Sequence, residues 1–257
     1  MVTDRRGALT DPATESGGVR RAIVLAGGKG TRLRPYTAVL PKPLLPVDDG
    51  PVLEIVMRQL RHAGFVHVTV ATGYLAELIE TVLNHRNLGG IKIDYVREDE
   101  PLGTVGPLAV ISDLTHPFLV MNGDVLTELD YSSLFADHIA SDAIATIAST
   151  MREVPVTLGV LECKDDRDPT KLTGYVEKPT LQFEVSMGIY CFSPRVLRYI
   201  EPGVHLDLPD LVLRLIEHGE TVRAWPSDAY WVDLGRREDY ERAILELDDM
   251  RDRLLPE

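Results

Sequence analysis

The stretch from Ala22 to Val47 constrains the fold of this chain more than any other. Four apolar residues, Ala22 to Leu25, predict a buried parallel strand, and the sequence Ala-Gly-Gly-Lys-Gly follows directly. Gly27, Gly28 and Gly30 would let a ligand approach the backbone closely, because no side chain stands in the way. Free backbone N–H groups in such a loop can converge on phosphate oxygens. The stretch therefore predicts a strand that opens into an anion-binding loop.

Basic and hydroxyl side chains accompany this loop. Thr31, Arg32 and Arg34 add a hydroxyl group and two fixed positive charges. Lys42 follows between two prolines, whose fixed φ angles stiffen the backbone that carries the ammonium group. A lysine held in this way is suited to binding a second anionic group. The plainer interpretation is a glycine turn with a solvated basic surface, because short motifs also give false matches.

Two better-known phosphate loops do not fit this stretch. The Walker pattern GxxxxGK[ST] needs Gly-Lys-Ser/Thr, whereas Lys29 lies between two glycines. The dinucleotide pattern GxGxxG fails because Leu33 stands where the third glycine belongs. Neither a P-loop nor a dinucleotide fingerprint is predicted.

Composition and charge narrow the class of protein. The 257 residues are 44% hydrophobic and 26% charged, which suits one large α/β domain or two small ones. The net charge of −13 argues against a general affinity for nucleic acid or anionic membranes, so a phosphate ligand needs a local basic cluster. Two cysteines without CxxC spacing suit a reducing cytosol. With no secretory signal and no apolar run of about 20 residues, we expect a cytoplasmic protein.

The first half of the chain alternates strands and helices. Strands are predicted over 66–71 and 91–96, and helices over 52–60 and 75–83. This rhythm is typical of βαβ units and a parallel sheet, in which ligands gather at the carboxyl ends of the strands. Further on, Gly103 and Gly106 would let the backbone pass close to a flat group, and Thr104 is predicted to cap a helix over 105–111.

Two aspartates each follow an apolar strand. Asp124 ends the run Phe118 to Asp124, and Asp233 follows Tyr230-Trp231-Val232. Alone, either aspartate is more often a turn former or a helix cap than a metal ligand. Meeting at one sheet edge beside a triphosphate, the two would offer the oxygen ligands that Mg²⁺ uses while it keeps waters and phosphate oxygens.

Beyond residue 141 the β content rises. Strands are predicted over 143–150, 157–163, 172–177 and 185–192, as a mixed or antiparallel extension of the sheet. The charged turn at 165–169 is predicted as a solvated hairpin tip. Helices are predicted over 194–200, over 208–217 with Asp207 as its cap, and over 236–250, where the last helix covers the sheet. The seven histidines show no metal spacing, and covalent catalysis is not implied.

The loop GGxGTRLRP followed by PKP resembles the sugar nucleotidyltransferases, which join a nucleoside triphosphate to a sugar 1-phosphate, and the likeness runs from Ala22 to about Tyr240. The pattern is most similar to mannose-1-phosphate guanylyltransferase-like enzymes, including those that act on heptose phosphates. The segment around Gly103 resembles EEPLGTAGPL, which contacts nucleobase and ribose in that group. The resemblance implies the following nucleotide-binding residues: Ala26, Gly27, Gly28, Gly30, Thr31, Arg32, Gly103, Thr104 and Asn122. It also implies that Asp124 and Asp233 bind Mg²⁺.

The sugar-phosphate site is likewise an expectation from this resemblance. Gly174 to Pro179 resembles the family's EKP motif, which implies that Lys178 holds the sugar phosphate and that Glu177 accepts hydrogen bonds from sugar hydroxyls. Gly159 is assigned to the same site. Ser186 stands where relatives commonly have asparagine, so the hydrogen bonds to the sugar should differ from those made to mannose. Without these motifs, a Glu-Lys pair on a strand is usually surface decoration.

These residues lead to one expected fold and reaction. We expect a Rossmann-like α/β fold with a mixed, mostly parallel sheet flanked by helices and a β-rich sugar-binding extension. Residues 1–20 would be a mobile leader and 21–257 a single domain, with a nucleotide half to about 140 and a sugar-phosphate half after it. No C-terminal β-helix of hexapeptide repeats is expected. Arg32, Lys42 and Lys178, with Mg²⁺, would neutralise charge while the sugar phosphate attacks the α-phosphorus.

The expected ligands are a nucleoside triphosphate, most simply GTP, and a sugar 1-phosphate or a cyclitol phosphate. No nucleic acid or membrane partner is expected, and a homo-oligomer is left open. A thymidylyl- or uridylyltransferase acting on a hexose 1-phosphate is the close alternative. A non-catalytic subunit that senses sugar nucleotides is the alternative from another class.

Overall fold

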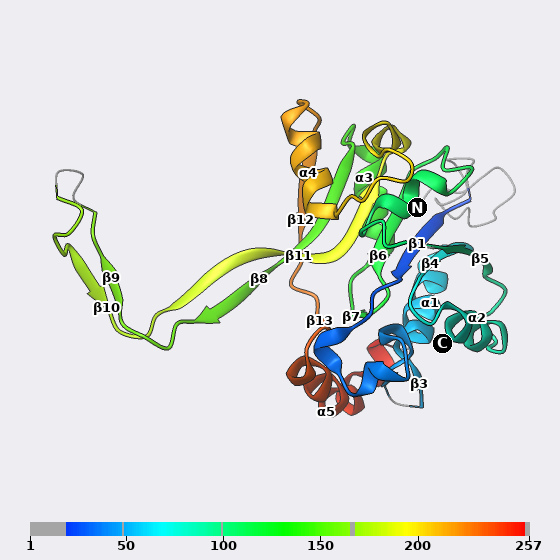
Figure 1. Cartoon of the computed structure of the whole chain (residues 1–257), viewed down its shortest axis with the longest axis horizontal. Coiled ribbons are helices and arrows are strands. Elements are labelled where there is room, and N and C mark those ends of the chain that lie inside the picture. The colour runs from blue at the N-terminus through cyan, green and yellow to red at the C-terminus, as the bar shows by residue number, and fades with distance from the viewer. Residues whose placement is uncertain (1–18, 48, 99, 165–167, 255–257) are drawn as a thin grey trace, which may run out of the picture.

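A seven-stranded sheet forms the centre of the molecule (Figure 1). The computed structural model describes residues 19–47, 49–98, 100–164 and 168–254. Most of the leader expected over residues 1–20, and residues 165–167 of the charged turn, lie outside these ranges. The strand order is β12-β8-β11-β6-β1-β4-β5, and β11 runs antiparallel to both of its neighbours while the other pairs are parallel. The expectation of a mixed, mostly parallel α/β sheet is confirmed.

The elements have the following bounds. In spatial order, the strands of the large sheet are Val222–Pro226 (β12), Ala145–Pro155 (β8), Thr180–Phe192 (β11), Phe118–Asn122 (β6), Arg21–Ala26 (β1), His67–Thr72 (β4) and Lys92–Arg97 (β5). Shorter strands pair outside it as Pro46–Val47 (β2) with Gly50–Pro51 (β3), Val125–Thr127 (β7) with Trp231–Asp233 (β13), and Val160–Glu162 (β9) with Gly174–Val176 (β10). The α-helices are Val52–His62 (α1), Ala76–Asn84 (α2), Tyr131–Ala140 (α3), Leu208–Glu217 (α4) and Arg237–Leu254 (α5).

Both faces of the sheet are buried, as its apolar strands require. Successive residues of β1 alternate between the two faces, so that Ala22 and Val24 join the core beneath α1, α2 and α3, whereas Ile23 joins the core beside α4. All three are fully buried. Burying a side chain such as Ile23 stabilises the fold by about 1.5 to 3 kcal/mol.

The segments predicted as helices over 105–111 and 194–200 are short 3₁₀ helices, Gly106–Val110 (η5) and Pro194–Tyr199 (η6). Each carries a proline in its first turn. The last helix, α5, also differs from its prediction, because it packs on a third core that includes Leu33 and Leu45 of the loop after β1. Its residues buried there include Tyr240, Ala243, Met250 and Leu254, whereas Leu245 is 80% exposed. None of the helices in the described ranges has the length and apolar character needed to cross a lipid bilayer.

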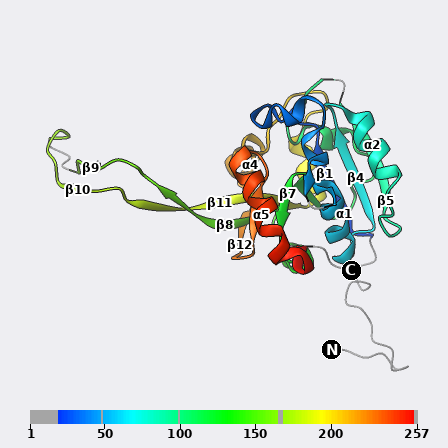
Figure 2. The ribbon, with the colours of Figure 1, turned by 90° about the horizontal axis from the view of Figure 1, so that it is seen from below.

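A two-stranded ribbon leaves the sheet and projects from the body, as Figures 1 and 2 show from two directions. The outer halves of β8 and β11 pair through Pro155 and Thr180, and the hairpin of β9 and β10 continues the ribbon. We call residues 151–185 the arm. The sequence predicted these strands as an extension of the sheet that forms a lobe beside the sugar site. The structure instead carries them outward, because β8 and β11 remain paired with each other beyond the last strand that flanks them.

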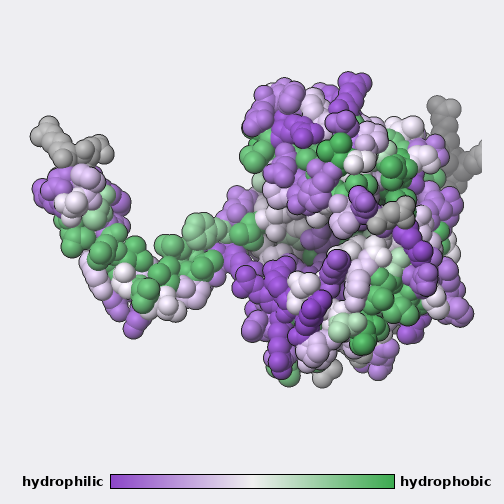
Figure 3. Space-filling model, viewed as in Figure 1, coloured by the Kyte–Doolittle hydropathy of each residue, from purple (hydrophilic) through white to green (hydrophobic). Residues whose placement is uncertain are grey.

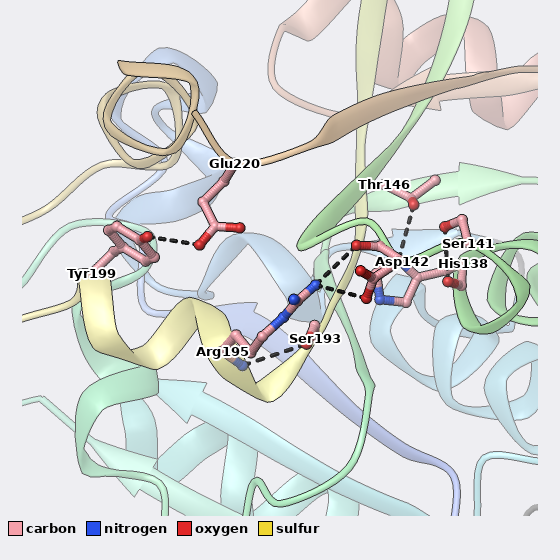
Figure 4. Close-up of polar contacts among 8 residues, drawn as sticks. All are labelled: His138, Ser141, Asp142, Thr146, Ser193, Arg195, Tyr199 and Glu220. Carbon is pink, nitrogen blue, oxygen red and sulfur yellow. Dashed lines mark hydrogen bonds and ion pairs between the residues drawn. The ribbon is translucent and has the colours of Figure 1, made fainter. Parts of the chain in front are cut away.

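A buried histidine joins α3 to the sheet. His138 is 2% exposed, and its Nδ1 lies 2.9 Å from Oγ1 of Thr146 on β8 (Figure 4). Nearby, Arg195 donates to the carbonyl oxygen and the carboxylate of Asp142, at 2.9 and 3.1 Å (Figure 4). Burial disfavours the charged imidazolium and lowers the pKa of His138 from 6.5 to about 4.

This histidine should make stability depend on pH. Between pH 6.5 and 4 the unfolded chain binds a proton that folded His138 does not, so the free energy of unfolding falls as the pH drops. From pH 7 to pH 5 this group should cost about 1 to 2 kcal/mol. We expect His138→Gln to be less stable than the wild type at pH 7 but to lose correspondingly less on acidification. Urea unfolding at both pH values measures the two losses, and equal losses would contradict the assignment.

Candidate active site

A cavity of about 450 Å³ lies where the order of the sheet strands reverses. Strand β1 has β4, which follows it in the chain, on one side and the later strand β6 on the other. Loops leaving the carboxyl ends of β1 and β6 therefore diverge there, as at ligand sites of other α/β sheets. Its described lining residues are Leu25, Ala26, Gly27, Gly28, Gly30, Thr31, Arg32, Lys42, Pro43, Ala71, Glu98, Pro101, Gly103, Thr104, Pro107, Asn122, Asp124, Asp207 and Asp233.

The glycine loop forms one wall of this cavity. Gly30 has a φ of +58°, a left-handed conformation that glycine adopts without strain. Its carbonyl oxygen accepts hydrogen bonds from the Leu33 N–H at 2.9 Å and from the Thr37 hydroxyl at 2.7 Å. These bonds fix the turn into the short 3₁₀ helix Thr31–Leu33 (η2), from which Arg32 reaches the cavity. All the loop residues assigned to the nucleotide lie together at this wall.

Lys42 crosses the floor of the cavity. It begins the 3₁₀ helix Lys42–Leu44 (η4), and the side chain is 15% exposed. Its ammonium group forms an ion pair with Asp124 and donates a hydrogen bond to Oδ1 of Asp233 at 3.3 Å. Burial lowers the pKa of Lys42, the carboxylate of Asp233 raises it, and the positive charge of Arg32 lowers it further. The predicted second anion-binding group therefore lies at the loop, already engaged by two carboxylates.

The two aspartates meet because β7 and β13 form a small sheet of their own. Asp233, at the end of β13, pairs in register with Val125, the residue after Asp124. The Leu234 N–H also donates to the Asp124 carbonyl oxygen at 3.1 Å. This pairing joins segments more than one hundred residues apart. The predicted meeting of the two carboxylates at one edge is what the structure shows.

The same two carboxylates could hold a divalent cation. Both already lie against one cationic group, the Lys42 ammonium, so their oxygens converge on a common point. Among the described residues, no group of three or more histidine, cysteine, aspartate or glutamate side chains could hold a metal ion. A metal here would therefore complete its coordination with water or phosphate oxygens, which is how Mg²⁺ is usually bound.

Another wall contains Gly103 and Thr104, and here neither predicted helix cap is formed. The Thr104 hydroxyl accepts a hydrogen bond from the Leu208 N–H at 2.7 Å and so caps α4, not the segment that follows Thr104. Asp207 makes no side-chain cap for α4, and its carboxylate instead accepts from the Thr104 N–H at 3.0 Å. These two hydrogen bonds tie this wall to the start of α4.

Two acidic residues of the cavity were not predicted from the sequence. Glu98 follows β5, and its carboxylate accepts from the Leu102 N–H at 3.0 Å. Burial raises the pKa of this carboxyl group. Its position after a parallel strand was a usable signal. Asp207 was interpreted only as a helix cap, because nothing in its local sequence indicates a cavity 100 residues away in the chain.

Four residues assigned to the sugar phosphate are not lining residues of the cavity. Gly159, Glu177 and Lys178 lie on the arm, where Lys178 is 66% exposed at its side chain and lies 3.6 Å from Glu177. Ser186 lies at the base of the arm, and its hydroxyl is 2.8 Å from the Tyr190 hydroxyl. Beside it, Gly188 packs against Asn122 of the cavity. Their role in sugar binding stays a prediction.

Comparisons with known proteins show which proteins this chain resembles. The nucleotidyl transferase family model matches residues 21–249. The chain is 35% identical over 244 residues to UTP--glucose-1-phosphate uridylyltransferase of Synechocystis, covering 87% of this chain, and 34% identical over 227 residues to the mannose-1-phosphate guanylyltransferase catalytic subunit beta of Danio rerio, covering 86%. It spans 62% of the length of each of these two relatives.

A solved structure is similar over most of both chains. The crystal structure of HddC from Yersinia pseudotuberculosis complexed with GMP-PN superposes with a TM-score of 0.68 and 28% identity. The match covers 89% of this chain and 99% of that one.

The wall at Gly103 provides a test of the cavity geometry. Gly103 has a φ of +78°, and a Cβ there would lie 2.5 Å from the Leu206 carbonyl oxygen. Gly203 has nearly the same φ, +77°, with no atom within 4 Å of such a Cβ. We expect Gly203→Ala to cost about 1 kcal/mol from the left-handed backbone alone, and Gly103→Ala about 1 to 3 kcal/mol more because the wall must shift. Urea unfolding compares the two variants, and equal losses would show that the wall is looser than described.

Proposed function

This chain belongs to the nucleotidyl transferase family, and from that membership we propose that it transfers a nucleoside monophosphate, GMP in the first instance, to a sugar 1-phosphate or a similar cyclitol phosphate. An oxygen of the sugar phosphate attacks the α-phosphorus of the triphosphate. The bond from that phosphorus to the bridging oxygen breaks, and pyrophosphate leaves. The products are a nucleoside diphosphate sugar and pyrophosphate.

The observation that supports this reaction best is the meeting of Lys42, Asp124 and Asp233 beside the glycine loop. The nucleophile already carries negative charge, so the reaction needs no general base. It needs two polyanions to be held together and their growing charge to be neutralised. Arg32 and Lys42 bring positive charge to this cavity. A close unit-charge pair is worth on the order of 4 kcal/mol at ~4 Å and an effective dielectric constant of about 20, before desolvation is subtracted.

A divalent cation, Mg²⁺, completes the proposal, held by Asp124 and Asp233. When bound, it would supply positive charge to the phosphate oxygens and the leaving pyrophosphate. The two aspartates would position it, while the glycine loop would orient the triphosphate through its backbone N–H groups.

We propose GTP as the nucleotide donor because two similar proteins are named with guanine nucleotides or guanylyl transfer. One is named a mannose-1-phosphate guanylyltransferase subunit, and the similar HddC structure contains GMP-PN. The relative named a uridylyltransferase supports UTP as the alternative donor. A non-catalytic sensor of sugar nucleotides is a weaker alternative, because a protein that only binds nucleotides has no need for the carboxylate pair at Asp124 and Asp233.

The metal assignment predicts a specific loss of turnover. We expect Asp124→Asn and Asp233→Asn each to lower Mg²⁺-dependent kcat at least about 100-fold, because each removes charge that neutralises the transition state. The KM for the sugar phosphate should change much less. Asp210→Asn, on the exposed surface of α4, is the matched control and should keep wild-type kinetics. Unchanged turnover in both cavity variants would refute the assignment.

The mass of the nucleotide sugar that forms identifies the two substrates. Purified protein with Mg²⁺ should release pyrophosphate from GTP and at least one of mannose, glucose, heptose and inositol 1-phosphates, and mass spectrometry should detect the matching GDP-sugar. Products from UTP or dTTP instead would support the alternative donors. No pyrophosphate from any pair would favour the sensor.

A further inference from the structure

The Lys42 ammonium lies at the point on which the two cavity carboxylates converge. It forms an ion pair with Asp124 and lies 3.3 Å from Oδ1 of Asp233. The side chains of Lys42 and Asp124 are 15% and 12% exposed, so this pair is largely closed to solvent. One unit of positive charge is therefore already bound where the proposed Mg²⁺ needs both carboxylates.

An ammonium group and a divalent cation cannot share this point. Mg²⁺ binds carboxylate oxygens at about 2.0 to 2.1 Å in nearly octahedral geometry. A lysine ammonium donates to the same oxygens from about 2.7 to 2.9 Å. Both would have to lie within a few ångströms of each other, and a divalent ion repels the ammonium twice as strongly as a monovalent ion does. One of the two cations must therefore leave when the other binds.

The carboxylate pair alone should be a weak metal site. Within the described part of the chain, no third histidine, cysteine, aspartate or glutamate side chain joins it to make a group that could hold a metal ion. Lys42 competes for the pair from a fixed position, because its backbone begins η4 between Pro41 and Pro43. A tethered group acts at a high effective concentration, which an ion from solution does not have. A divalent cation should therefore displace Lys42 poorly by itself.

The glycine loop offers the Lys42 ammonium a second position. The Lys42 Cβ lies 3.3 Å from the position that a Cβ on Gly30 would take. The side chain thus starts beside the loop that is predicted to bind phosphate groups, and its flexible four-carbon stem can rotate while the backbone stays in place. Phosphate oxygens bound by this loop would compete with the carboxylates for the ammonium group.

Ions from solvent can reach the cavity. Figure 3 shows a hollow in the body between the part that contains α4 and the part that contains α5, with hydrophilic residues around much of its rim. Asp207 at the start of α4 and Asp233 shortly before α5 are lining residues of the cavity. The Asp233 side chain is 41% exposed, far more than that of Asp124. An ion from solvent would meet Asp233 first, while Asp124 is still paired with Lys42.

We propose that Lys42 occupies the cation position between Asp124 and Asp233 until phosphate oxygens of a bound nucleoside triphosphate replace the carboxylates as partners of its ammonium group. The divalent cation and the triphosphate then bind together. This inference rests on the proposed function, because it concerns how the same cavity takes up its ligands. By linkage, the triphosphate tightens cation binding by the same factor by which the cation tightens triphosphate binding.

Binding of Mn²⁺ in the absence of nucleotide tests the exchange. Mn²⁺ binds to the same oxygen ligands as Mg²⁺, and the electron paramagnetic resonance signal of the free ion measures how much is bound. Lys42→Met removes the competing charge, so it should bind Mn²⁺ at least about tenfold more tightly than the wild type. Lys42→Arg keeps the charge and should show no gain. Lys92→Met is the matched control, because Lys92 also pairs with an aspartate, 3.2 Å from Asp94, but is not a lining residue of the cavity.

Further variants locate the bound ion. Adding Asp124→Asn to Lys42→Met should abolish the gain in affinity, because the ion loses one of its two carboxylates. Equal Mn²⁺ affinities of the wild type and Lys42→Met would overturn the inference, since the two cations would then bind side by side. An equal gain in Lys92→Met, or a gain that survives Asp124→Asn, would also overturn it. These measurements need no turnover, so a protein that binds Mn²⁺ as expected but forms no product would count against the proposed function alone.

A second measurement uses the wild type and does not depend on the folding of a variant. Crystals are grown with Mn²⁺ and a GTP analogue that has a methylene group between the α- and β-phosphorus atoms. Anomalous scattering should place the ion at Asp124 and Asp233, with the Lys42 ammonium against phosphate oxygens and away from both carboxylates. An ammonium group that keeps its contacts with both carboxylates beside the bound ion would contradict the exchange.

Discussion

The parallel pairing of β1 with β6 is the constraint on which the cavity depends. It sets Leu25 opposite Asn122, and the Gly123 N–H donates to the Leu25 carbonyl oxygen at 2.9 Å just beyond the paired residues. The glycine loop and the segment of Asp124 therefore start side by side although about one hundred residues separate them. Because β4 occupies the other side of β1, the two loops must diverge, and the space between them is the cavity.

Electrostatics at that point are balanced by one ammonium group. Two carboxylates that converge without a cation would repel each other, and partial burial strengthens this repulsion. The Lys42 ammonium, in contact with both, offsets it. Burial lowers the pKa of Lys42 while Asp233 raises it, so the carboxylates favour the charged form that the buried position disfavours. Flanking prolines stiffen the backbone of this lysine, which is why the short Pro-Lys-Pro sequence alone predicts a rigidly held ammonium group.

The side of the cavity formed by the glycine loop could be predicted from sequence because its signals are local. A strand, a glycine loop and a proline-flanked lysine lie within 26 residues, and each follows from backbone chemistry. Asp207 was missed because its partner, Thr104, is distant in the chain and the helix-capping pattern gave a complete local explanation. Strand composition also predicted β8 and β11, but not the direction in which they run, since a ribbon that returns to the body and one that leaves it have the same alternation.

For the arm, local patterns leave a question open, namely how far from the cavity its strands carry their residues. Gly188, beside the base of the arm, packs on Asn122 of the cavity, so this base is fixed while the outer part of the arm extends beyond the sheet.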